Sequence, residues 1–127
     1  LSEQPRRGAQ YYSIRALSND AAALLSAIAY AGADDPESAK NCFEKGLQRF
    51  GGAASGITLL SREGCTLDRI DRALEKFAGA TPHIKRAVLE ACASCILADR
   101  EVRVAEAELL RAISAALDCP MPPVLNK

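Results

Sequence analysis

The sequence contains a single histidine, His83, and no tryptophan among its 127 residues. A zinc-peptidase helix of the HExxH type needs two histidines four residues apart, so this chain cannot form one. A triad with serine or cysteine would depend on His83, which follows Pro82 in the expected first turn of a helix. We therefore expect His83 to be a surface or partly packed residue, and the chain to have no catalytic centre.

Net charge and long apolar runs are also lacking. Lys plus Arg number 16, as do Asp plus Glu, so no whole-chain field attracts nucleic acid or anionic lipid. The longest apolar run, roughly residues 21 to 31, is far shorter than the ~20 residues that span a bilayer. We expect no nucleic-acid partner and no direct membrane insertion. The chain begins LSEQPRRGAQ, with no methionine and no signal peptide, which suggests a fragment of a longer protein.

The five cysteines indicate reduced thiols, because the count is odd and no secretory signal is visible. Cys92 and Cys95 form a CxxC pair, which suggests three alternatives: a redox site, a metal site or core packing. A redox pair sits at a helix N-terminus, whereas this pair lies about ten residues into an expected helix. Tetrahedral zinc needs two further ligands, and the other cysteines are scattered. Core packing is the favoured interpretation.

The remaining patterns predict an all-α fold, a compact antiparallel bundle of four to six helices. Helices are expected at about 18–30, 36–50, 66–78, 82–98 and 104–117, and residues 53–64 form a short helix or a turn. Residues 1–17 are expected to be an extended lead-in, 18–119 a single helical domain, and 120–127 a Pro-rich tail. The capping candidates are Ser18 or Asn19, Asp35, Thr66, Thr81 and Arg103.

Helical periodicity also predicts which side chains face the core. In the helix that begins after Thr66, the inward residues are expected to be Leu67, Ile70, Ala73, Leu74 and Phe77. In the last helix they are expected to be Leu109, Leu110, Ile113, Ala116 and Leu117.

An acidic corner joins the last two expected helices, with Asp99, Glu101 and Glu106 as weak candidate cation ligands. The spacing does not fit a calcium loop, which needs carboxylates at fixed positions and a central glycine. Glu106 lies three residues after Arg103, so its carboxylate can accept from the N–H of the cap residue. We expect a structural helix junction, with partner contact and cation binding as alternatives. Because arginine has no capping hydroxyl, Arg103→Ser is expected to stabilise the helix.

The stretch HIKRAVLEACASCILADREVRVAEAELLRAISAALDCPMPP resembles the C-terminal cytoplasmic region of bacterial Zn-dependent proteases with chaperone function. These are membrane metallopeptidases of the HtpX and CAAX-prenyl-protease type, metallopeptidase family forty-eight. The upstream YYSIRALSNDAAALLSAIAYAG fits the same region. Asp99, Val102 and Glu106 also match the TerB-like pattern D-G-x-V-x-x-x-E, with Arg100 in place of the glycine and Arg103 where Ser or Thr is usual.

The resemblance implies a non-catalytic accessory domain, regulatory or protein-binding, of a membrane-bound zinc peptidase. Zinc is expected in a peptidase domain of the parent, and no cofactor in this chain. The implied partners are that peptidase domain, its protein substrates or a second copy of the chain. The implied place is the cytoplasmic side of the bacterial inner membrane. The alternative function is a TerB-like cation sensor that uses Asp99, Glu101 and Glu106.

Overall fold

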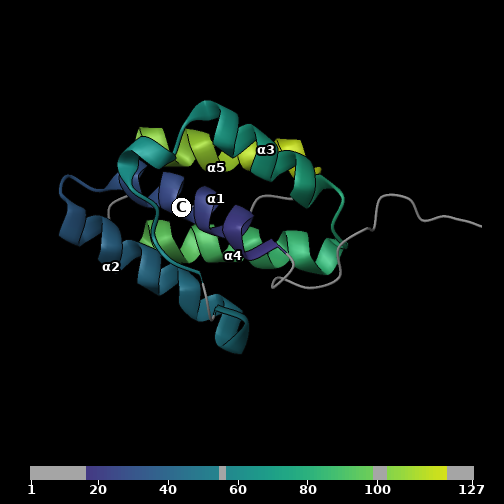
Figure 1. Cartoon of the computed structure of the whole chain (residues 1–127), viewed down its shortest axis with the longest axis horizontal. Helices are drawn as coiled ribbons and strands as arrows, with labels where there is room; N and C mark the ends of the chain where they lie inside the picture. Colours follow the sequence, from purple (N-terminus) through teal and green to yellow (C-terminus); the bar gives the residue numbers. More distant parts are fainter. Residues whose placement is uncertain (1–16, 55–56, 99–102, 120–127) are drawn as a thin grey trace, which may run out of the picture.

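The computed structural model describes residues 17–54, 57–98 and 103–119, which form a helical bundle (Figure 1). Its helices are α1 (Ser18–Gly32), α2 (Pro36–Leu47), α3 (Leu67–Ala78), α4 (Pro82–Leu97) and α5 (Val104–Leu117). Two short 3-10 segments are η2 (Gln48–Ala54) and η3 (Arg62–Gly64). Five helices and no strand among these residues confirm the predicted all-α class. Residues 1–16 of the expected lead-in and the tail 120–127 lie outside the described residues.

The centre of the bundle is α1, which packs against each of the other four α-helices (Figure 1). Every residue from Asp20 to Ala29 is buried. The side chains of this part of α1 are mostly small or aliphatic on every side of the helix, so neighbouring helices pack against it from several directions. A helix that is apolar on all sides belongs in the interior. The position of α1 therefore follows from its sequence.

Side-chain caps fix the starts of α2, α3 and α4, as predicted. The Asp35 carboxylate accepts from the N–H of Ser38 at 2.7 Å. The hydroxyls of Thr66 and Thr81 accept in the same way from the third residue of α3 and of α4. The prediction for α1 was wrong, because its N-cap residue is Leu17, which makes no side-chain cap. Leu17 is buried, so packing holds this end of the helix.

The contact between α2 and α4 depends on a glycine. A Cβ on Gly46 would lie 2.7 Å from the backbone oxygen of Ala91 and 2.8 Å from Cδ1 of Leu25. Only a residue without a side chain allows the two helices to approach so closely. The α-helix ends at Leu47, about three residues before the expected end, and continues as η2. Gly51 in η2 has a φ of 59° and turns the chain.

Two residues expected in the core are exposed. Leu67 begins α3 and is 78% exposed, and Ala116 on α5 is also exposed. On α3 only Ala73 and Phe77 are fully covered. The apolar stripe of α3 is therefore wider than the surface that its neighbours cover. Its uncovered part lies at the N-terminal end of the helix.

Candidate functional site

The CxxC cysteines lie on the buried side of α4. Cys92 and Cys95 are both inaccessible to solvent. Burial without a nearby charge raises the pKa of Cys92 to about 12, so this thiol stays neutral at physiological pH. His83, by contrast, is exposed in the first turn of the same helix. In the described part of the chain, no group of three or more His, Cys, Asp or Glu residues is arranged to hold a metal.

Asp99 and Glu101 of the acidic corner lie outside the described residues. Glu106 lies at the third position of α5, and its Oε1 accepts from the backbone N–H of Arg103 at 2.9 Å. This is the contact that the spacing predicted. The side chain is only 2% exposed. Burial of the carboxylate was not predicted, because sequence spacing carries no information on what covers a helix terminus.

The C-terminal end of α1 covers Glu106. A Cβ on Gly32 would lie 1.8 Å from Oε2 of Glu106, so the carboxylate fills the space that a side chain would need. Nearby, the guanidinium of Arg103 donates to both carboxylate oxygens of Asp34, at 2.8 and 3.0 Å. Hydrogen bonds and charge from Arg103 lower the pKa of Asp34. Gly32, Asp34, Arg103 and Glu106, hereafter the corner, join α5 to the turn between α1 and α2.

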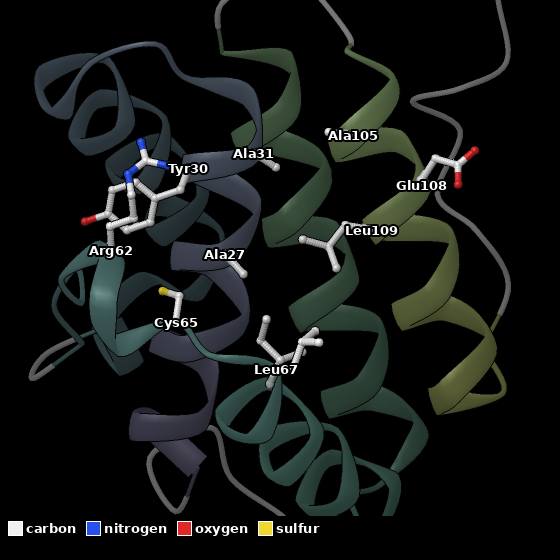
Figure 2. A pocket seen from close by; sticks show the side chains of 10 residues that line it. Ala27, Tyr30, Ala31, Arg62, Cys65, Leu67, Ala105, Glu108 and Leu109 are labelled. Atoms are coloured by element: carbon white, nitrogen blue, oxygen red, sulfur yellow. The ribbon is translucent and has the colours of Figure 1, made fainter.

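A second feature is an open groove of about 530 Å³ (Figure 2). Its walls come from α1, η3, α3 and α5, and it lies against the uncovered end of α3. Figure 2 shows Ala27 and Ala31 between Tyr30 on one side and Leu109 on the other, with Leu67 at one end. The residues that line the groove are Ala27, Tyr30, Ala31, Arg62, Cys65, Leu67, Ile70, Ala105, Glu108 and Leu109.

One wall of the groove is fixed by two α1 side chains that hold Leu60. The hydroxyl of Tyr30 donates to the carbonyl of Leu60, and the N–H of Leu60 donates to the hydroxyl of Ser26 at 3.0 Å. Both backbone groups of Leu60 are thus satisfied without a helix or a sheet. The guanidinium of Arg62 lies over the Tyr30 ring, 4.6 Å from its centroid. The segment before η3 is therefore attached to α1.

A largely buried ion pair fixes α3 on α1. Nη1 of Arg69 lies 3.0 Å from Oδ1 of Asp20, and Nη2 donates to the carbonyl of Asn19 at 3.0 Å. The Asp20 side chain is almost fully covered. A buried carboxylate needs such a partner. The pair holds the first turn of α3 against α1, and with it Leu67 at the edge of the groove.

Charge is confined to the margins of the groove. Arg62 and Glu108 lie on opposite sides of it in Figure 2, and neither has an ion-pair partner within the described ranges. In Figure 2, Cys65 lies on the same side of the groove as Arg62. Burial raises the pKa of Cys65, and the nearby Arg62 and Arg69 oppose this rise. The groove thus has an apolar interior, a cation on one margin and an anion on the other.

Sequence reasoning missed the groove, although part of the signal was present. The weakly patterned segment 53–64 was expected to be a short helix or a turn, and its Arg62 lines one wall. Tyr30 and Ser26 are four residues apart on α1, which is the spacing of neighbours on one helix face. Nothing in the sequence indicated that both contact Leu60, because the contacts join residues 30 and 34 positions apart.

No protein-family model, no curated protein and no solved structure matches this chain. None of the described helices is both long and apolar enough to cross a membrane.

Proposed function

We propose that this chain is a non-catalytic accessory domain that binds a protein segment in the groove. The observation that carries the proposal is the exposed apolar surface around Leu67, which is 78% exposed next to a preformed groove. Apolar residues at a groove, bordered by charged side chains, are typical of interaction sites. The fixed wall at Tyr30 supports the same function, because a preformed surface loses little entropy on binding.

The resemblance to membrane zinc peptidases supplies the expected context. In that context the partner is the peptidase domain of the same parent chain, or a protein substrate that it cleaves. Zinc belongs to that peptidase domain, and the domain described here lies on the cytoplasmic side of the bacterial inner membrane. We also propose that the helices are arranged as in TerB-like domains. The gene provides a direct test, because transmembrane segments and an HExxH motif are expected upstream of residue 1.

A binding experiment tests the function itself. The 127-residue chain is titrated in trans with the peptidase region of the parent and with a protein that the peptidase cleaves. We expect saturable binding to one of them, weakened by about tenfold or more in Leu67→Gln, as loss of a buried leucine implies. Leu97→Gln is the matched control, because Leu97 is also exposed, at 51%, but lies outside the groove. Equal binding by both variants contradicts the proposal.

A second experiment addresses catalysis. We expect the purified chain to leave casein intact, with and without added zinc, because His83 has no second histidine to act with. Cleavage that requires zinc and stops with a chelator would contradict the non-catalytic assignment.

A further inference from the structure

The shape of the groove determines which kind of protein segment fits it. An extended peptide binds by adding to a free sheet edge, and the described residues contain no strand. A proline-rich segment needs a groove lined by several aromatic rings. Here Tyr30 is the only aromatic residue in the lining, and Arg62 covers its face. An amphipathic helix in an apolar groove is the mode that remains.

The polar groups of the groove argue against a small polar ligand. Such ligands are oriented by a few convergent donors and acceptors. The Tyr30 hydroxyl already donates to Leu60, and the raised pKa of Cys65 keeps its thiol neutral. The remaining polar groups, Arg62 and Glu108, lie on opposite margins rather than converging on one point (Figure 2).

The same two margins define the occupant. On the basis of the proposed binding function, we propose that the groove binds one amphipathic helix of a partner protein. This helix has an acidic flank that faces Arg62 and a basic flank that faces Glu108. Its apolar stripe lies over Ala27, Ala31 and Leu109, where two of the three side chains are methyl groups that allow a close approach.

The charges also determine the direction of the helix. If an amphipathic helix is reversed in a groove, its two flanks exchange sides. A helix with one acidic and one basic flank therefore pairs with both Arg62 and Glu108 in one direction only. In the other direction it places like charges together, which is unfavourable. The groove thus selects both the charge pattern and the direction of its partner.

Three synthetic helical peptides with the same apolar stripe test this inference against the 127-residue chain. One has an acidic and a basic flank, one has two acidic flanks, and one has two basic flanks. Binding is measured by fluorescence anisotropy at low salt. We expect the mixed peptide to bind best, by about two- to fivefold for each charge pair gained. It should also slow alkylation of Cys65 but not of Cys119, which is partly exposed outside the groove.

Charge-reversal variants make the test specific. Arg62→Glu makes both margins acidic, so the preferred peptide should become the one with two basic flanks. Glu108→Lys should shift the preference to the peptide with two acidic flanks. Lys40→Glu and Glu44→Lys are the matched controls, because they make the same charge changes at exposed positions of α2 outside the groove. These controls should leave the order of the three peptides unchanged.

Each other outcome overturns the inference. Equal binding of the three peptides, or an order that Arg62→Glu does not change, excludes recognition by charged flanks. A concentration-dependent dimer in sedimentation that Leu67→Gln dissociates makes a second copy of the chain the occupant. Suppose that no peptide binds, but that the peptidase region or the substrate binds Leu67→Gln more weakly than Leu97→Gln. The helix inference then fails and the proposed function stands. If Leu67→Gln and Leu97→Gln bind these partners equally well, the proposed function fails, whatever the peptides do.

Discussion

Glu106 and Glu108 lie two residues apart on α5 and have opposite environments. Residues two apart on a helix do not face each other, so one carboxylate enters the corner and the other borders the groove. In the corner, Glu106 is buried against Gly32 and accepts from Arg103. In the groove, Glu108 is exposed. The comparison shows that one turn of α5 provides stability on one side and leaves a surface for binding on the other.

The corner should respond most strongly to added volume. We expect Gly32→Ala to destabilise the fold by ~3 kcal/mol, because its Cβ would occupy the position of the Glu106 carboxylate. Urea unfolding measures the change. The double variant Gly32→Ala with Glu106→Ala is the control, since removing the carboxylate makes room for the methyl group. A double variant that loses the full sum of the two single effects would show that the side chains do not compete for one space.

Removal of the Glu106 carboxylate should have the next largest effect. Glu106→Ala leaves the Arg103 N–H without this acceptor and opens a small cavity, at a cost of ~1–2 kcal/mol. Glu106→Gln should lose less, because its amide oxygen can accept the same bond. Thermal melts in EDTA and in millimolar Ca²⁺ or Mg²⁺ should give the same difference from wild type. A wild type stabilised by several degrees by an ion, with no gain in Glu106→Ala, would favour the cation sensor instead.

The Arg103→Ser variant should have a smaller effect than sequence reasoning indicated. A serine cap contributes about 0.5–2 kcal/mol relative to a residue that cannot cap, but the variant loses both hydrogen bonds to Asp34. These effects oppose each other, so we expect a small net gain in stability near neutral pH. The gain should increase in 1 M salt, where the exposed ion pair contributes less. A gain that is equally large at low salt would show that the Asp34 contact adds nothing.

The ion pair between Arg103 and Asp34 also predicts that the stability effect of Arg103→Ser depends on pH. The pKa of Asp34 is lowered in the fold, so its contribution is present above the unfolded pKa near 3.8 and is lost as the pH falls through the lower folded value. The advantage of Arg103→Ser over wild type should therefore increase below pH 4. Unfolding of Asp34→Asn, which lacks this titration, provides the control, since Arg103→Ser should add no acid-dependent advantage in that background.

The groove should respond least to substitution when folding is the readout. We expect Leu67→Gln to change the free energy of unfolding by less than ~0.5 kcal/mol, as is usual for exposed positions. Leu97→Gln should behave in the same way. Circular dichroism during urea unfolding measures both. A large loss in Leu67→Gln alone would mean that Leu67 supports the fold, and the comparison between the corner and the groove would no longer hold.

The sequence by itself determined the features that depend on neighbours within about four residues. The caps at Asp35, Thr66 and Thr81 are of this kind, as is the bond from Arg103 to Glu106, because both partners lie in one turn of helix. The interior position of α1 was not predicted, although its almost wholly apolar sequence accounts for it, since such a helix has to be covered.

Only the tertiary structure decided the features that join distant segments. Examples are the burial of Glu106 against Gly32, the exposure of Leu67, and the contact of Tyr30 with Leu60. Helical periodicity gives the direction of a side chain about its own axis, but not which neighbouring helix arrives there or how far along it extends. The groove exists because α5 and η3 leave the first turn of α3 uncovered. How much of α3 its neighbours cover is set by packing across the whole bundle.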